Sequence, residues 1–177
     1  MPERRSPAET FEELAMPLFD QLYNFARWLT QDASEAEDLV QETYAKALRG
    51  FAGFQVGTNF RAWMYRILRN TFLTSRAGLK SAGSSEEELE VLASTDPSPE
   101  AILVDKANRE MVQQSLAELP LQFRDVLLLC EVEEMSYAEI AQVLAIPIGT
   151  VMSRLHRARK ALRQLLIEKS KGGPRGL

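Results

Sequence analysis

Few side chains in this sequence could carry catalytic or metal chemistry. The 177 residues include one histidine, His156, and one cysteine, Cys130, which together are too few for a metal site within the chain. The sequence has no Gly-rich phosphate loop and no G-x-S-x-G nucleophile motif. We therefore expect no catalytic residue, no cofactor and no metal, and the sequence disfavours an enzyme.

The single cysteine also indicates where part of the core lies and which cellular compartment suits the protein. Cys130 ends the apolar run VLLLC, so we expect it in the core rather than as a redox sensor. A lone cysteine excludes an internal disulfide and fits a reducing compartment. No run approaches the roughly 18 apolar residues that span a bilayer, and the charged N-terminus lacks the apolar stretch of a signal peptide. We expect a cytoplasmic protein without membrane insertion.

Binding chemistry gathers instead in the stretch IPIGTVMSRLHRARKAL, residues 146–162. The chain has a formal net charge of -4, yet eight Lys or Arg and one acid lie from Arg154 to its end. Helical spacing puts Val151, Leu155, Ala158 and Leu162 in one apolar stripe. Short polar and cationic side chains lie around the rest of the helix: Thr150, Ser153, Arg154, His156, Arg157, Arg159, Lys160 and Arg163. Such a helix suits a DNA groove, where short polar residues and Arg reach base edges and flanking cations bind phosphates.

The residues before this helix indicate a helix-turn-helix. Ser136 and Glu139 form a capping box that opens a short helix ending at Leu144. A tight turn, 145–147, leads to the basic helix, which is then the recognition helix. Two further helices, 101–118 and 121–133, are expected on either side of the stop at Leu119-Pro120.

A second basic helix is predicted after the loop FAGFQVGTN, with Asn59 as its cap. One arc carries Phe60, Trp63, Met64, Ile67, Leu68 and Thr71, and the opposite side carries Arg61, Tyr65, Arg66, Arg69 and Arg76. Trp63 and Asn70 lie at the boundary. Guanidinium groups with aromatic rings suit a nucleic-acid strand, but a core-facing apolar arc with a solvated basic back is the alternative.

The N-terminal residues predict two more helices, opened by the capping boxes Thr10–Glu13 and Ser34–Glu37. Pro17 should kink the first helix or delay its start. The second should bury Leu39, Val40, Ala47 and Leu48, which leaves Asp38, Gln41 and Glu42 as an acidic patch. From the pattern alone that patch is a solvated face or a partner surface.

Composition divides the chain into two domains. Residues 81–100, SAGSSEEELEVLASTDPSPE, are rich in Ser, Glu and Pro without periodicity and indicate a flexible acidic linker. We expect an all-α fold with helical domains at 1–80 and 101–177. No dimerisation helix is evident, and the free chain is expected to be a monomer.

These segments, in this order, resemble a sigma factor of the extracytoplasmic-function type (group IV), the smallest bacterial class. AEDLVQETYAKA, 36–47, resembles the segment of sigma domain 2 that binds the polymerase clamp helices. GTNFRAWMYRILRNTF, 57–72, resembles the segment that melts and reads the -10 element. Residues 119–162 resemble sigma domain 4, which reads the -35 element. The pattern is most similar to members paired with redox-responsive zinc anti-sigma factors.

The resemblance implies roles for individual residues. It implies that Asp38, Gln41 and Glu42 bind core RNA polymerase. It implies that the loop 54–60 captures a flipped base and that the helix after it reads the -10 element. The -10 residues are then Phe54, Asn59, Phe60, Arg61, Trp63, Tyr65, Arg66, Arg69 and Asn70. The -35 residues are Thr150, Ser153, Arg154, His156, Arg157 and Lys160. Met152 stands where some relatives carry arginine, so one DNA contact would be missing.

Two other functions use the same segments differently. A sigma-like decoy that binds only an anti-sigma protein would not need the basic face around Arg157. A simple homodimeric repressor would need a dimerisation helix and has no use for the patch at 36–47. Transcription from a defined promoter with core polymerase separates the three.

Overall fold

The computed structural model describes residues 7–81 and 101–172, and the predicted linker lies outside them except for its first residue. Every regular element in these two ranges is a helix, which confirms the all-α expectation. The chain divides into two compact units. One is Met1–Glu90 with Ala138–Ala145, and the other is Val91–Tyr137 with Ile146–Leu177.

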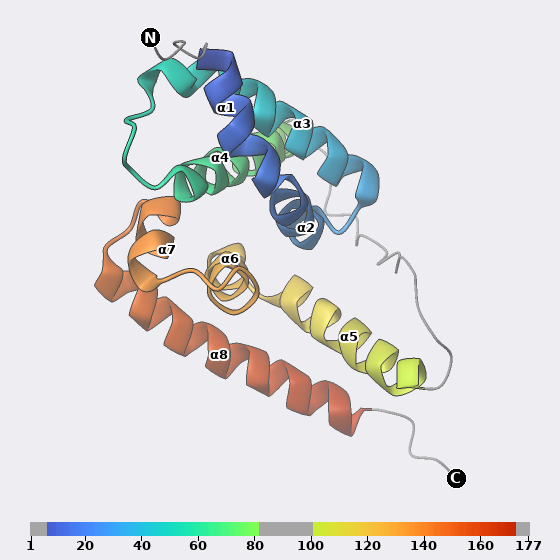
Figure 1. Ribbon diagram of the computed structural model, residues 1–177. Coiled ribbons are helices and arrows are strands. Elements are labelled where there is room, and N and C mark those ends of the chain that lie inside the picture. The colour runs from blue at the N-terminus through green and yellow to red at the C-terminus, as the bar shows by residue number, and fades with distance from the viewer. Residues whose placement is uncertain (1–6, 82–100, 173–177) are drawn as a thin grey trace. The chain divides into compact units, whose positions relative to one another are not determined.

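Four helices build the N-terminal part of the first unit (Figure 1). They are α1 (Pro7–Ala15), α2 (Phe19–Thr30), α3 (Ala33–Gly50) and α4 (Phe60–Ser81), with 3-10 turns at Met16–Leu18 and Phe51–Gly53. The predicted opening at Thr10 is wrong, because α1 begins at Pro7. Pro17 lies in the first 3-10 turn, where its missing N–H separates α1 from α2.

The start of α3 is set by a residue that the capping-box pattern did not select. Asp32 is the N-cap, and its Oδ1 accepts a hydrogen bond of 2.8 Å from the backbone N–H of Glu35. The predicted start at Ser34 is therefore two residues late. Just before it, Gln31 ends α2 in the left-handed conformation, with φ 56°. These residues make the tight corner between α2 and α3.

The core of this unit is formed by one side of α2, α3 and α4. Its fully buried side chains include Leu22, Phe25, Ala26, Val40, Ala47, Met64, Tyr65 and Leu68. Leu48 was predicted to be buried with Val40 and Ala47 but is 51% exposed. One residue of helical rotation, about 100°, is enough to carry it from the core to the surface.

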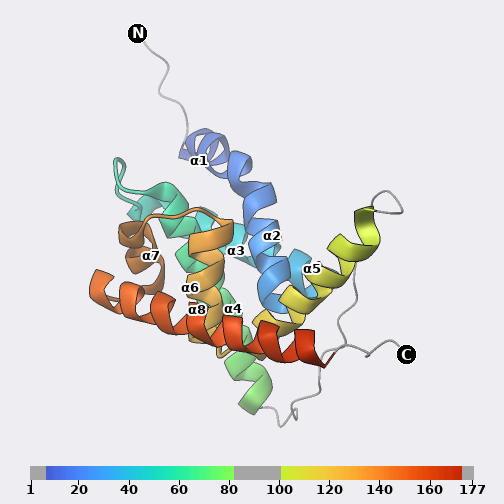
Figure 2. The ribbon, with the colours of Figure 1, turned by 90° about the horizontal axis from the view of Figure 1, so that it is seen from below.

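The second unit contains α5 (Ala101–Glu118), α6 (Leu121–Leu127) and α8 (Ile148–Lys171), a long helix evident in Figure 2. Arg124 joins the first two of these helices. Its guanidinium donates hydrogen bonds to the backbone oxygens of Leu116, Ala117 and Leu119. These groups lie at and just beyond the end of α5, so one side chain caps that helix and fixes the corner at Pro120.

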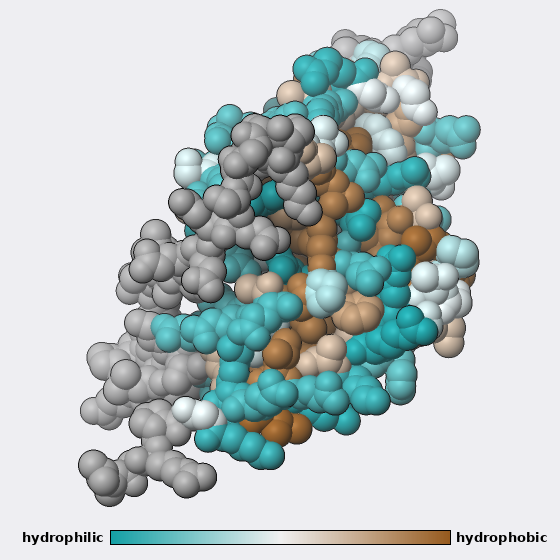
Figure 3. Space-filling view, turned by 180° about the vertical axis from the view of Figure 1, so that it is seen from behind, coloured by the Kyte–Doolittle hydropathy of each residue, from teal (hydrophilic) through white to brown (hydrophobic). Residues whose placement is uncertain are grey.

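The predicted helix 121–133 is not α-helical throughout. Residues Leu128–Val132 form a π-helical turn, and the N–H of Glu133 donates to the oxygen of Leu128, five residues earlier. A short helix, α7 (Tyr137–Leu144), follows directly after Ser136, as predicted. Seen from behind, brown apolar residues interrupt a mostly teal polar surface (Figure 3).

Candidate functional site

The acidic patch predicted on α3 lies on the exposed side of that helix. Asp38, Gln41 and Glu42 are all exposed, while Leu39 and Val40 between them are buried. Glu42 pairs with Lys46 one turn later, with 3.2 Å between Oε1 and Nζ. Asp38 has no ion pair within the described residues. The surface therefore offers carboxylates to a cationic partner.

Aromatic rings gather at the loop before α4. Phe54 stacks on Phe51, with centroids 6.0 Å apart and planes 12° apart, and lies 5.0 Å from Trp63. Phe60 lies 5.3 Å from Phe54, and Phe11 of α1 lies 5.3 Å from Phe51. The predicted rings Phe54, Phe60 and Trp63 are thus brought together. They are half-buried against each other and hold the loop in place.

Two local devices shape the loop itself. Gly57 has φ 96°, a conformation that favours glycine, and the hydroxyl of Thr58 donates to the oxygen of Gln55. Asn59 caps α4, as predicted, by accepting 2.9 Å from the N–H of Ala62. Val56, directly before Gly57, is 89% exposed. The sequence reading did not single out Val56, although an apolar residue next to a loop glycine was a visible signal.

The basic side of α4 is only partly as predicted. Arg66 and Asn70 are exposed, and Arg61 and Arg69 are half-buried. Placing Tyr65 with them was wrong, because its ring is fully buried, 5.2 Å from Phe25. Position 65 adjoins Met64 and Leu68 on the core side, so helical rotation brings it inward. The buried ring has no exposed face for a base.

Arg61 lies above that buried ring. Its Cζ is 5.4 Å from the Tyr65 centroid, and its Nε donates 3.2 Å to Oε1 of Gln21. Tyr65 thus supports a guanidinium of the basic surface from below.

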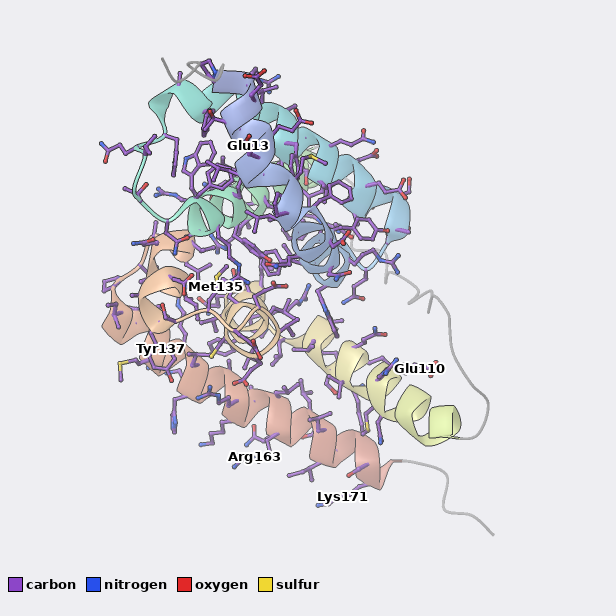
Figure 4. All side chains as sticks on the ribbon, in the orientation of Figure 1. Glu13, Glu110, Met135, Tyr137, Arg163 and Lys171 are labelled. Atoms are coloured by element: carbon purple, nitrogen blue, oxygen red, sulfur yellow. The ribbon has the colours of Figure 1, made fainter. Side chains whose placement is uncertain are left out.

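The basic helix α8 has the two-sided character that the sequence predicted. Val151, Leu155 and Ala158 are buried, with exposures of 0%, 1% and 0%. Ser153, His156, Arg157 and Lys160 are exposed, and Thr150 and Arg154 are half-buried. Further along α8, Arg163 and Lys171 point to its lower side in Figure 4, away from α5 and α6. The helix buries an apolar stripe and presents cations.

The turn before α8 is tight. Ala145 has φ 54°, and Pro147 is the N-cap residue of α8. Gly149 lies in the first turn, and apart from its chain neighbours and the nearby backbone of the helix no atom lies within 4 Å of the position that a Cβ would take. The first turn of α8 is therefore sterically open, and the order along the chain, a short helix, a turn and a long helix, is the one predicted for a helix-turn-helix.

One predicted flank cation has a different environment. Arg159 donates hydrogen bonds of 3.0 and 2.7 Å to Oε1 of Glu131, and its Nη2 lies 3.7 Å from Sγ of Cys130. These contacts tie α8 to the π-helical turn and raise the pKa of Arg159. Cys130 is half-buried, and burial raises the pKa of its thiol, with a further increase from Glu131. Spacing along the chain could not have revealed this pairing.

Within residues 7–81 and 101–172, no single helix is long and apolar enough to cross a membrane. The same residues contain no group of three or more His, Cys, Asp or Glu side chains arranged to hold a metal ion.

Comparison with known proteins assigns both halves of the chain. Residues 14–81 match the Sigma-70 region 2 family, and residues 109–162 match Sigma-70 region 4. The chain is 33% identical over 158 residues to the RNA polymerase sigma factor YlaC of Bacillus subtilis, covering 88% of this chain and 91% of that one. It is 36% identical over 163 residues to the ECF RNA polymerase sigma factor SigE of Mycolicibacterium smegmatis. The chain belongs to the ECF family of RNA polymerase sigma factors.

That alignment with SigE covers 91% of this chain and 63% of the relative. A solved structure, the sigma factor RpoE of Bartonella quintana in complex with the anti-sigma factor NepR, matches with a TM-score of 0.73 and 29% identity. It covers 89% of this chain and 97% of that one. This ECF sigma factor binds core RNA polymerase and directs promoter-specific initiation of transcription, so it is an initiation factor.

Proposed function

We propose that three surfaces of this ECF sigma factor divide the work of initiation. The acidic face of α3 binds core polymerase, the loop before α4 with the basic side of α4 opens and reads the -10 element, and α8 reads the -35 element. One observation carries the proposal: α8 buries an apolar stripe while Arg157 and Lys160 remain exposed beside it. A helix with this division is suited to lie in the major groove.

For polymerase binding, the proposal rests on exposure and charge. Asp38, Gln41 and Glu42 lie on one exposed side of α3, above a buried apolar face. Replacing both carboxylates with lysine therefore changes the surface and leaves the core unaltered. We expect Asp38→Lys with Glu42→Lys to abolish co-elution with core polymerase while the melting temperature stays close to that of the parent. Normal co-elution of this double variant would show that the patch is only solvated surface.

Of the residues on α4 assigned to the -10 element, Arg66 and Asn70 are exposed, while Arg61 and Arg69 are half-buried beside them. Arg61, Arg66, Arg69 and Asn70 face the single strand, and the loop with Asn59 receives an extruded base. Phe54, Phe60 and Trp63 pack against each other, so we assign them first to holding the loop and second to stacking. Extruding a base costs a few kcal/mol, which a rigid loop can return through contacts with that base.

At the -35 element, Arg157 and Ser153 are assigned to base edges. Thr150, Arg154, His156 and Lys160 are assigned to phosphates or to the rim of the groove. The N–H groups of Ile148 and Gly149 at the start of α8 can bind a phosphate, because the hydrogen bonds to the oxygen of Pro147 begin only with the N–H of Thr150. Met152, 54% exposed, contributes no charge at its position.

In this proposal the chain consists of two domains, residues 1–80 and 101–177, joined by the acidic segment 81–100. The free protein is a monomer in the cytoplasm. A regulatory partner belongs to it as well. The Bartonella quintana sigma factor was solved in complex with an anti-sigma factor, and we extend such a partner to this chain. The resemblance in sequence pattern supports the finer proposal that this partner is a redox-responsive zinc protein.

The experiment that tests the proposal compares promoter binding with and without core enzyme. Each DNA-binding helix offers few cations, and release of counterions from so few phosphates gives weak, salt-sensitive binding. We expect little specific binding by the free chain at physiological salt and strong binding once core polymerase is added. Fluorescence anisotropy of a labelled promoter fragment measures both. Nanomolar specific binding by the free chain would favour the homodimeric repressor instead.

A further inference from the structure

A pocket of about 310 Å³ opens in the first unit between α3 and the second half of α4. Its floor includes Leu39 and Phe72, which are 6% and 5% exposed. Glu35, Asp38 and Glu42 line it from α3. Their spacing along the sequence, three and four residues, places all three carboxylates on one side of the helix. The pocket therefore combines an apolar floor with an acidic rim.

One guanidinium already lies in this pocket. Arg76, from the far end of α4, lines it with its Cζ 5.2 Å from the centroid of the Phe72 ring and its Nη2 3.2 Å from Oε2 of Glu35. An aromatic ring face and a carboxylate are two kinds of group that commonly hold an arginine side chain in proteins. Arg76 shows which chemistry the pocket accepts.

The occupied pocket still carries an excess of negative charge. Three carboxylates line it, and one of them is paired with Arg76. Glu42 is paired with Lys46 of the same helix, and Asp38 has no ion pair within the described residues. A second long cationic side chain could lay its methylene groups over Leu39 and Phe72 and reach these carboxylates with its charged end. The volume is at the lower limit of ligand pockets, which run from roughly 300 Å³ upward, and suits one side chain rather than a larger ligand.

We propose that this pocket receives one arginine side chain of core RNA polymerase and that Arg76 competes with it in the free sigma factor. The inference rests on the proposed function, because Asp38 and Glu42 belong both to the pocket and to the proposed polymerase surface. It adds Glu35, Leu39 and Phe72 to that surface. It also makes Arg76 an internal competitor, whose release from Glu35 accompanies assembly.

Removing the competitor should strengthen assembly, an effect opposite in sign to the loss of a supporting contact. We expect Arg76→Ala to raise the affinity of the full-length chain for core polymerase by roughly two- to fivefold, the range of one exposed ion pair. We expect Glu35→Gln to lower it by a similar factor. Arg76→Met keeps much of the stem over Phe72 without the charge, so it should also raise affinity if Arg76→Ala unfolds α4.

Arg49→Ala is the matched control. It removes one exposed arginine at the end of α3, away from the pocket lining, and so reports the general effect of making the protein more acidic. Affinities are measured by titrating fluorescently labelled sigma factor with core polymerase at two salt concentrations. If the Arg76 variants bind no tighter than Arg49→Ala, or more weakly than the parent, the inference is overturned.

The double variant Asp38→Lys with Glu42→Lys distinguishes a failure of the pocket proposal from a failure of the proposed polymerase surface. If it abolishes assembly while the Arg76 variants match Arg49→Ala, the polymerase surface stands and only the pocket is wrong. If it assembles normally, the polymerase surface lies elsewhere and both proposals fail.

Discussion

Substituting Arg157 is the most direct test of the proposal that α8 reads the -35 element. The side chain is exposed on α8 between the buried residues Leu155 and Ala158, and it has no hydrogen-bonding or ionic partner within the described residues. Arg157→Ala should therefore change the free energy of unfolding by no more than about 0.5 kcal/mol. Any loss in DNA binding is then a loss of contacts with DNA rather than of folded protein.

The size of the loss follows from the contact assigned to it. An arginine that bonds base edges contributes about 1–3 kcal/mol, which is roughly a 5- to 150-fold change in affinity. The loss should be confined to the preferred base at one position of the -35 element. Arg159→Ala is the matched control, because Arg159 is held by Glu131. It should cost about 0.2–1 kcal/mol of stability and leave base preference unchanged.

The assay uses the variants assembled with core polymerase. Promoter fragments are selected from a library randomised over the -35 element, and the affinity for the preferred fragment is then measured at several salt concentrations. If Arg157→Ala weakens all fragments equally and lowers the salt slope by about one, Arg157 binds a phosphate. Unchanged preference in the selection refutes the assignment of Arg157 to a base.

Three further predictions follow from burial and local geometry. Tyr65→Ala should lower the free energy of unfolding by about 3–5 kcal/mol, because the ring is fully buried. Tyr65→Phe should change the free energy of unfolding by no more than about 1.5 kcal/mol. It should also leave promoter opening, measured by permanganate footprinting, unchanged. Gly149→Ala should stabilise the protein by about 0.5–1 kcal/mol in thermal melts, since the position is open, and should weaken promoter binding by the holoenzyme if DNA approaches that backbone. Burial, aided by the charge of Asp20, raises the pKa of Tyr44 to about 12, so the folded state favours the neutral phenol. The resulting contribution to folding stability is complete below about pH 10 and is lost as the pH rises toward 12. Tyr44→Phe should cost about 1 kcal/mol through the lost hydrogen bond to the oxygen of Ala15 and should flatten alkaline unfolding followed by circular dichroism.

The helices were predictable from sequence wherever periodicity and turn residues agreed. Leu119-Pro120 separates α5 from α6, and Ser136 directly precedes α7, as expected. Capping boxes were less reliable, because the pattern S-x-x-E at Ser34 competes with Asp32 two residues earlier. The aspartate wins by accepting the N–H of Glu35, a choice that depends on how α2 ends and not on local preference.

The candidate site was predictable in its charges but not in its pairings. The exposed carboxylates of α3 and the cations of α8 lie where the helical spacing put them. The prediction for Tyr65 was wrong because a 100° arc does not define the core when two neighbouring helices enclose more of α4. Phe25 packs against the Tyr65 ring. The pairs Arg159–Glu131 and Arg76–Glu35 join residues 28 and 41 positions apart. Only tertiary packing brings such residues together.

The π-helical turn at Leu128–Val132 has a consequence for how much change this region tolerates. A π-helical turn holds one residue more than the α-helical hydrogen-bonding pattern would need. Deleting one residue there would let the segment relax into a continuous α-helix, and the residues directly after it would rotate by about 100° and shift by about 1.5 Å relative to α6. Glu131 would then turn away from Arg159, and Met135, now 3% exposed, would leave its buried position. The extra residue thus acts as a spacer that sets the direction in which the chain leaves α6, and the length of the chain in this turn is constrained as well as the identity of its residues.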